Sequence, residues 1–357
     1  LPRYQTYRVE VQDVLSVGGV VYFNPTATNA SGIMTENINV DFVYASTGFM
    51  TTLQDVKTFL SLQEVSIDVK RTALVNTEFN NFTVNIILTN PASGVQYTMP
   101  IRFMAVDTYT KLVDGVEVQF VGARCMFKYT LPDSIPFDER EQVLATGETF
   151  QSGIYYYQGT SATVGDQSFT PLTEGVDYEV GDTVGENIYK HAWSDTQDGT
   201  GNLRTSLAMR YGSNVYHESN VDKWLNAQGD DWFEASHIGD ILANWYKGKK
   251  GFKSWFKPED LAIIEENVAY GVYERSGHTV PNNTIYRQFV LPSGTNIAGS
   301  VNANEGLCFD YWKYLNGGII SNSANANRTI TKVNATTSKQ TIWLRSPYRS
   351  YSYFAWH

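Results

Sequence analysis

Two features are missing from this 357-residue sequence, a long apolar run and an excess of basic residues. No apolar run approaches the ~20 residues that a membrane-spanning helix needs, so we expect no membrane insertion. The 27 Lys and Arg against 37 Asp and Glu give a net charge of −10. Because binding to nucleic acid requires basic side chains that neutralise phosphates, we expect no nucleic-acid partner.

Cysteine is scarce, and the common catalytic motifs are missing. Cys125 and Cys308 lie in different regions, each among apolar and aromatic residues. This context favours two buried thiols, with a disulfide as the alternative. The chain contains no Gly-x-Ser-x-Gly, no Walker A sequence and no Gly-x-Gly-x-x-Gly.

The five histidines also lack metal-ligand spacing such as His-x3-His. A zinc site built from His191, His217 and a carboxylate stays open as the less favoured alternative. Asp230 and Asp231 could supply half of a carboxylate pair, but adjacent acidic residues in a loop more often face solvent. We therefore predict a protein that is not an enzyme and that uses no metal or other cofactor.

What is present predicts two differently built regions. All eight Trp follow residue 190, whereas before residue 130 apolar residues alternate with polar ones, as in antiparallel strands with one buried face. The predicted fold class is a two-domain protein with an N-terminal all-β antiparallel sandwich (1–135) for attachment or oligomerisation. A β-rich connecting segment (136–189) and an α+β display domain (190–357) come next. We expect separate cores in the two domains.

Local signals refine the first domain. Only 53–61 has helical spacing there, and the alternation of Val65, Ile67 and Val69 predicts a strand. Pro100 inside a predicted strand indicates an edge or a kink, and Gly122 indicates a bulge.

In the second domain, Ser219 is a candidate N-cap for a helix that carries Trp224. Helical spacing also runs from Ile238 to Trp245, and Pro258 stands at a first-turn position.

Five longer segments of the second domain occur in the order of a known family. They are Tyr211-Gly212-Ser213-Asn214 with Lys223-Trp224-Leu225-Asn226, Gly251-Phe252 with Phe256-x-Pro258-Glu259-Asp260-Leu261, Phe289-Val290-Leu291-Pro292-Ser293, Asn304-Glu305-Gly306, and Trp343-Leu344-Arg345-Ser346-Pro347-Tyr348. Region 190–357 therefore resembles a domain family of bacteriophage virion proteins and some bacterial surface proteins. The resemblance implies a C-type-lectin-like fold, related to receptor-binding domains varied by diversity-generating retroelements, and a domain that continues past His357.

The resemblance also implies a function. We expect a virion structural protein, of the tail or head fibre or decoration type, that recognises a glycan or protein receptor on a bacterial surface. Its partners would be other virion proteins and copies of itself, with a trimer as the expected oligomer. The alternatives are a purely structural capsid or tail component and a bacterial adhesin. Neither the calcium-ligand signatures of sugar-binding lectins nor the catalytic cysteines of formylglycine-generating enzymes occur here.

Within the motifs, one set of residues is typical of structural framework and another of a binding surface. The predicted framework consists of Trp224, Leu225, Trp343, Leu344 and Arg345, with both tryptophans buried and Arg345 able to pair with a carboxylate such as Glu305. The run after Pro347 interleaves Tyr with Ser, the composition of antibody paratopes. The predicted ligand-binding residues are Tyr348, Arg349, Tyr351, Tyr353 and Trp356. The alternative is a Tyr-rich strand with half of its rings in the core.

Overall fold

The computed structural model describes most of the chain between residues 45 and 346 and short stretches before it. The described ranges are 6–10, 14–17, 20–23, 29–33, 45–63, 65–75, 82–138, 142–143, 146–151, 155–158, 169–190, 215–234, 242–272, 283–298, 305–315, 330–334, 339–340 and 342–346.

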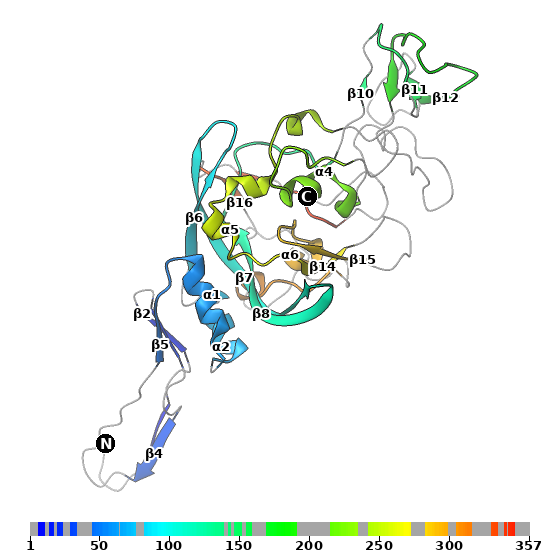
Figure 1. Ribbon diagram of the computed structural model, residues 1–357. Helices are drawn as coiled ribbons and strands as arrows, with labels where there is room; N and C mark the ends of the chain where they lie inside the picture. The colour runs from blue at the N-terminus through cyan, green and yellow to red at the C-terminus, as the bar shows by residue number, and fades with distance from the viewer. Residues whose placement is uncertain are drawn as a thin grey trace.

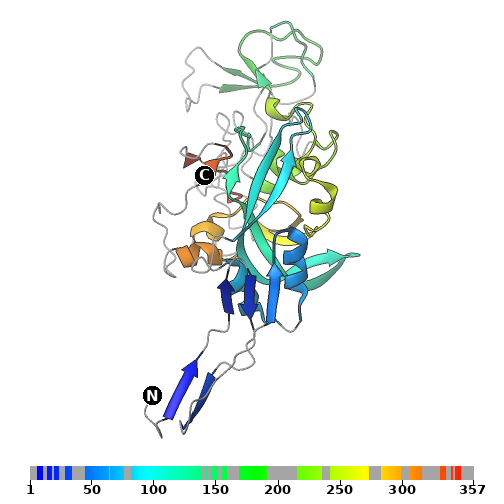
Figure 2. The ribbon, with the colours of Figure 1, turned by 90° about the vertical axis from the view of Figure 1, so that its left-hand side faces the viewer.

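The N-terminal region combines strands with two helices. Its elements are β1 (Thr6–Glu10), β2 (Val14–Val17), β3 (Val20–Phe23), β4 (Asn29–Ile33), β5 (Ala45–Phe49), α1 (Leu53–Ser61), α2 (Ile67–Val75), β6 (Thr83–Thr89), β7 (Gln96–Val113), β8 (Val116–Phe127) and β9 (Tyr129–Thr130). Strands β1 and β4 form a two-stranded ribbon, and β2, β3 and β5 form a three-stranded sheet. The ribbon extends away from the rest of the molecule (Figures 1 and 2).

The rest of the chain has shorter elements. They are β10 (Gln142–Val143), β11 (Tyr155–Gln158), β12 (Phe169–Leu172), β13 (Ile188–Lys190), the 3-10 helices η1 (Tyr216–Glu218), η2 (Asn244–Tyr246) and η3 (Phe252–Trp255), α4 (Asn220–Leu225), α5 (Pro258–Leu261), β14 (Val268–Val272), β15 (Asn283–Arg287), α6 (Gly294–Ala298), α7 (Asp310–Leu315), β16 (Ile330–Lys332) and β17 (Lys339–Gln340). Helices and antiparallel sheets are therefore mixed along the chain.

The largest sheet is built around the β7–β8 hairpin. Strand β7 pairs with β6, β8 and β14, all antiparallel, and β15 extends the sheet beyond β14. Asp114 and Gly115 turn the hairpin with positive φ angles of 51° and 78°, as a two-residue type I′ turn requires. Pro100 pairs with Asn85 of β6, and its carbonyl oxygen accepts from Lys128 N just past the last β7–β8 pair, so its missing N–H falls at the end of the β8 ladder.

The predicted separation into two cores is wrong for the described residues. Val268 of β14 pairs with Lys111 of β7, and Thr331 of β16 pairs in parallel with Tyr129 of β9. One apolar cluster also unites residues from both regions, among them Phe59 and Trp255. The confinement of Trp to the second half of the sequence therefore does not indicate a separate core. The boundaries at 135/136 and 189/190 stay predictions.

Three further predictions for the first region are wrong. Ile67–Val75 is a helix, because the Ser66 side chain accepts a hydrogen bond from Val69 N and caps its start. Helix α2 packs against β7, and no second sheet covers that face among the described residues, so they show no sandwich. The register shift lies between Phe103 and Ala105 of β7, while Gly122 is in regular register with Asp107.

Several predicted elements are confirmed. Helix α1 has the predicted bounds, and Thr52 and Asp55 form a capping box at its start. Ser219 caps α4, and Pro258 opens α5. The helix predicted between Ile238 and Trp245 falls largely outside the described residues, which hold only the 3-10 turn η2 there.

The connecting segment contains a small sheet with its own core. The strand order is β10-β13-β11-β12, all antiparallel. Its core consists of Phe150, Tyr155, Tyr178, Val184 and Ile188, a cluster separate from the main one. The sheet lies apart from the rest of the molecule in both views (Figures 1 and 2). The described part of this segment is therefore rich in strands.

Candidate functional site

The polar centre of the second region starts at the N-terminus of α4. Ser219 Oγ accepts from Asp222 N at 3.3 Å and donates to Tyr216 O at 2.6 Å. Ser219 is fully buried, so this cap satisfies backbone groups that water cannot reach. The cap fixes the direction in which the short helix presents Asp222.

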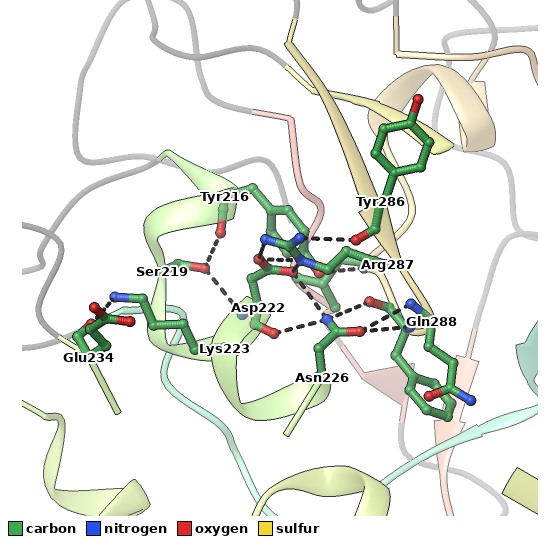
Figure 3. A network of polar contacts seen from close by, with 11 residues as sticks. Tyr216, Ser219, Asp222, Lys223, Asn226, Glu234, Tyr286, Arg287 and Gln288 are labelled. Atoms are coloured by element: carbon green, nitrogen blue, oxygen red, sulfur yellow. Dashed lines mark hydrogen bonds and ion pairs between the residues drawn. The ribbon is translucent and has the colours of Figure 1, made fainter. Parts of the chain in front are cut away.

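Asp222 meets Arg287 at the end of β15, as Figure 3 shows. Arg287 Nη2 lies 2.7 Å from Asp222 Oδ2, and Arg287 Nε donates to the same carboxylate at 2.9 Å. Asp222 is 1 % exposed, and burial raises its pKa despite the guanidinium that favours the charged form. The ion pair ties α4 to β15.

Asn226 joins the same elements through its side-chain amide. Its Oδ1 accepts from Gln288 N and Phe289 N, at 3.2 and 3.0 Å, and its Nδ2 donates to Phe289 O at 2.9 Å. One amide therefore satisfies three backbone groups of a segment that leaves its sheet after Arg287. Figure 3 shows Asn226 between the helix and this segment.

Arg345 is the second polar centre, and it is 2 % exposed. Its guanidinium donates to four oxygens: Gly271 O, Leu291 O, Asn296 Oδ1 and Glu305 O, at 2.6 to 3.0 Å. Burial lowers its pKa to about 10, while the negative charge of Glu305 favours the charged form. Arg345 therefore stays a cation at neutral pH.

Ser346 continues this centre and is fully buried. Its hydroxyl donates to the Glu305 carboxylate and accepts from Gly294 N at 2.8 Å. Arg345 therefore contacts Glu305 as predicted, but not through the carboxylate. In detail, Arg345 contacts the Glu305 carbonyl oxygen, and the carboxylate contacts Ser346.

The predicted framework residues have different environments. Trp224 is 1 % exposed, donates its indole N–H to Lys250 O at 3.0 Å and packs against Phe252. Leu344 is buried and Leu225 half-buried. The predicted burial of Trp343 is wrong.

Trp343 is 37 % exposed because it lies at the junction of the two regions. Its indole N–H donates to Ile135 O at 3.0 Å, and its ring meets Phe137 edge-on. The predicted ligand-binding residues, Tyr348, Arg349, Tyr351, Tyr353 and Trp356, all lie outside the described residues.

The titratable groups outside these centres form no metal site among the described residues. No group of three or more His, Cys, Asp or Glu side chains there is placed to hold a metal ion. His191 lies outside the described ranges, and Asp230 and Asp231 are exposed, as the solvent-facing alternative predicted. Cys125 and Cys308 form no disulfide, but only Cys308 is buried.

Sequence reasoning missed Asp222, Arg287 and Asn296 as framework residues. The signal was a charged or amide residue at a position that the local pattern assigns to the core. Asp222 directly follows Val221 in the first turn of α4, and Arg287 ends a strand that contains the buried Ile285. Because such a residue must find a partner inside the protein, each indicates a buried polar contact, without identifying the partner.

Comparisons with known proteins add one result. Residues 196–357 match a family described as Domain of unknown function (DUF6273). No curated protein and no solved structure matches the chain. In the described part of the chain, no helix is long and apolar enough to cross a membrane.

Proposed function

We propose that this chain is a bacteriophage virion protein that displays a binding surface for the bacterial cell, formed by the aromatic run at 348–356. Five sequence motifs support the resemblance behind this proposal. Described residues of these motifs meet in the two polar centres, where Asn226 binds Phe289 and Arg345 binds Glu305. Motif residues that satisfy one another inside the protein act as a scaffold for the C-terminal segment.

The observation that carries the proposal is the anchoring of residues 345 and 346. These are buried and hydrogen-bonded to four separate segments, at Gly271, Leu291, the 294–296 turn and Glu305. The aromatic run begins two residues later. A binding segment that starts from a rigid base loses less conformational entropy when it binds.

The composition of the run suits recognition without chemistry. Tyrosine and tryptophan supply large contact areas at a small cost in rotamer entropy, and serine adapts by hydrogen bonding. A glycan or a protein on the bacterial surface would fit this chemistry, through direct contact with the aromatic rings.

The test is adsorption of virions that carry Tyr351→Ala with Tyr353→Ala. An aromatic anchor contributes about 2 kcal/mol at an interface, so we expect at least a tenfold loss of adsorption with an unchanged melting temperature. Tyr157→Ala is the matched control, because Tyr157 is an exposed tyrosine of the small sheet. Unchanged adsorption of the double variant, or absence of the chain from the particle, would contradict the proposal.

We also propose that the chain assembles as a homo-oligomer, with a trimer as the expected state. Among the described strands, β8 pairs only with β7, so its other edge is available for association. Val116 at the hairpin tip is 63 % exposed. Light scattering of the purified protein tests this, and a monomer at micromolar concentration would contradict it.

A further inference from the structure

A run of lysines follows η2 in a chain that is acidic overall. Residues 247–257 hold five of the 27 basic residues and no Asp or Glu, whereas the whole sequence has a net charge of −10. We call this segment the lysine loop, and its basic residues are Lys247, Lys249, Lys250, Lys253 and Lys257. A local concentration of positive charge on a negatively charged protein is a candidate interaction surface.

Two indole groups hold the backbone of the lysine loop in place. Trp232 Nε1 donates to Lys249 O at 2.8 Å, and Trp224 Nε1 donates to Lys250 O at 3.0 Å. Gly251 packs so closely that a Cβ there would stand 2.1 Å from a carbonyl oxygen of the chain after α4. Because the backbone is already fixed, little of its conformational entropy is lost when a partner binds the lysines.

Part of the positive charge of the lysine loop is neutralised within the chain. Lys253 pairs with Glu266 at 3.1 Å, and Lys249 Nζ lies 3.9 Å from the centre of the Trp245 ring. The two acidic residues after Gly229 offset more of the charge, because the Gly229 carbonyl oxygen accepts from the loop at 2.7 Å. The other lysines are exposed and form no ion pair with a described residue: Lys247, Lys250 and Lys257. Three ammonium groups are therefore available to a partner with negative charge.

The small sheet β10–β13 carries the complementary charge. Residues 141–189 contain eight Asp and Glu and no Lys, Arg or His. The described acidic residues of this segment are all exposed and form no ion pair with a described residue: Glu148, Glu174, Asp177, Glu179, Asp182 and Glu186. The sheet projects from the rest of the molecule (Figures 1 and 2). Among the described residues, its negative charge is therefore left without a basic partner in the same chain.

An apolar centre lies within this acidic surface. Gly175 has a positive φ of 81°, and its N–H donates to Tyr178 O at 2.9 Å, which closes a tight turn. Val176 in this turn is 80 % exposed, and Val180 after it is 51 % exposed. Protein interfaces place apolar side chains at their centre and charged ones at the rim. The turn that begins at Glu174 therefore has the layout of a contact surface.

We propose that the lysine loop of one copy binds the small sheet of a second copy of this chain. Both surfaces belong to the same chain, so each copy brings the complement that the other needs. The inference rests on the homo-oligomer proposed above and names its contact surfaces, which are separate from the edge of β8. Because the contact joins two different surfaces, each copy has one of each for a neighbour, and the expected trimer closes these contacts into a ring.

Charge reversal on each surface tests the contact, with the oligomer of the full chain measured by sedimentation velocity. Lys247→Glu with Lys250→Glu, or Glu174→Lys with Glu179→Lys, should each raise the dissociation constant at least about tenfold, because like charges then face each other. All four substitutions in one chain should restore the oligomer, since the charges become complementary again. Asp133→Lys is the control, because Asp133 is exposed and lies outside both segments, and it should leave the oligomer unchanged.

Salt tests the same contact without substitutions. The dissociation constant of the unsubstituted oligomer should rise at least about tenfold between about 0.1 and 1 M NaCl, because salt screens attraction between exposed charges. An oligomer that persists in high salt and in both charge-reversed variants would overturn this proposal and leave the homo-oligomer standing. Failure of the chain with all four substitutions to regain the oligomer would overturn it as well. A monomer at low salt would contradict the homo-oligomer itself, and this contact with it.

Discussion

The β6–β8 sheet and the region from 215 to 346 solve the same problem of buried backbone in different ways. In the sheet, each strand satisfies its neighbour, and apolar side chains such as Ile86, Met99 and Phe103 fill one face. In the described part of the later region, helices and strands are short and much of the backbone lies outside them. There the half-buried Asn226 and the buried Arg345 bind the backbone directly with their side chains.

This difference indicates in which region the stability of the fold depends on single residues. A strand ladder distributes hydrogen bonding over many equivalent backbone groups, so one substitution changes packing alone. A buried side chain that holds several carbonyl groups has no substitute when it is removed. Three mutational experiments and one pH titration test this contrast, beginning with the largest expected effect.

The first experiment asks whether the two regions can be separated at all. A chain of residues 190–357 should fail to melt cooperatively, because Phe252 and Phe256 lose their contacts with Phe127, and Val268 loses its partner Lys111. The measurement is a thermal melt followed by circular dichroism.

A second truncation provides the control for the first. Replacing residues 146–187 by a short Gly-Ser linker should keep the main transition, because the small sheet has its own core. An isolated 190–357 chain that melts like the full chain would contradict the shared core.

The second experiment removes the cation that holds four segments together. Arg345→Met should destabilise the protein by about 3–5 kcal/mol, because the buried Glu305 loses its compensating charge and several carbonyl groups lose their donor. Met99→Leu, a volume-conserving change at a fully buried position of the sheet, should cost less than about 1.5 kcal/mol. Equal effects in chemical denaturation would contradict the contrast between the two regions.

The regular elements of the first region could largely be predicted from the sequence, because their apolar residues recur with a fixed period. The alternation in 83–89 and 96–103 predicted β6 and the start of β7, and the spacing of Leu53, Val56 and Phe59 predicted α1. The 65–75 segment failed because Val65, Ile67 and Val69 alternate with the period of a strand, whereas the residues that α2 buries are Lys70, Ala73, Leu74 and Val75. The capping hydroxyl of Ser66 decides in favour of the helix.

The two polar centres, around Asp222 and around Arg345, were harder to predict for a physical reason. Sequence spacing indicates which face of an element is buried, but it does not indicate which distant segment comes to meet it. Arg345 could be assigned a carboxylate partner, yet its described hydrogen-bond acceptors are backbone carbonyls and the Asn296 amide. Arg287 stood in a strand without a recognisable motif and was missed. The same limit explains the wrong expectation for Trp343, whose partners Ile135 and Phe137 lie far earlier in the chain.

The third experiment compares two tryptophans of the same motif set. Trp224→Ala should cost about 3–5 kcal/mol, as expected for a large aromatic residue in a packed core. Trp343→Ala should cost only about 1–2 kcal/mol, because the ring is 37 % exposed and loses its hydrogen bond to Ile135 O. A loss at Trp343 as large as that at Trp224 would mean that the junction is more tightly packed than this exposure indicates.

The last and smallest effect is a pH dependence at the junction. Burial alone would raise the pKa of Glu265, but its hydrogen bond and ion pair with Lys111, together with the charge of Lys57, lower it on balance. A carboxyl with a lower pKa in the folded state stabilises the protein above its ordinary pKa of 4.5, and this contribution is lost as the pH falls through the folded value. Because Glu265 is about one third exposed, we expect less than about 1 kcal/mol.

Glu265→Gln should therefore lower the stability at pH 7 and flatten its decline below pH 4.5, measured by urea denaturation across this range. Glu266→Gln is the control, because Glu266 pairs with Lys253 at a more exposed position. Asp222 contributes with the opposite sign, since its raised pKa gives stability that is present in acid and is lost as the pH rises through the folded value. Acid should thus reduce the contribution of Glu265 to stability while it increases that of Asp222. An unchanged pH profile in Glu265→Gln would show that the junction is held by its apolar contacts alone.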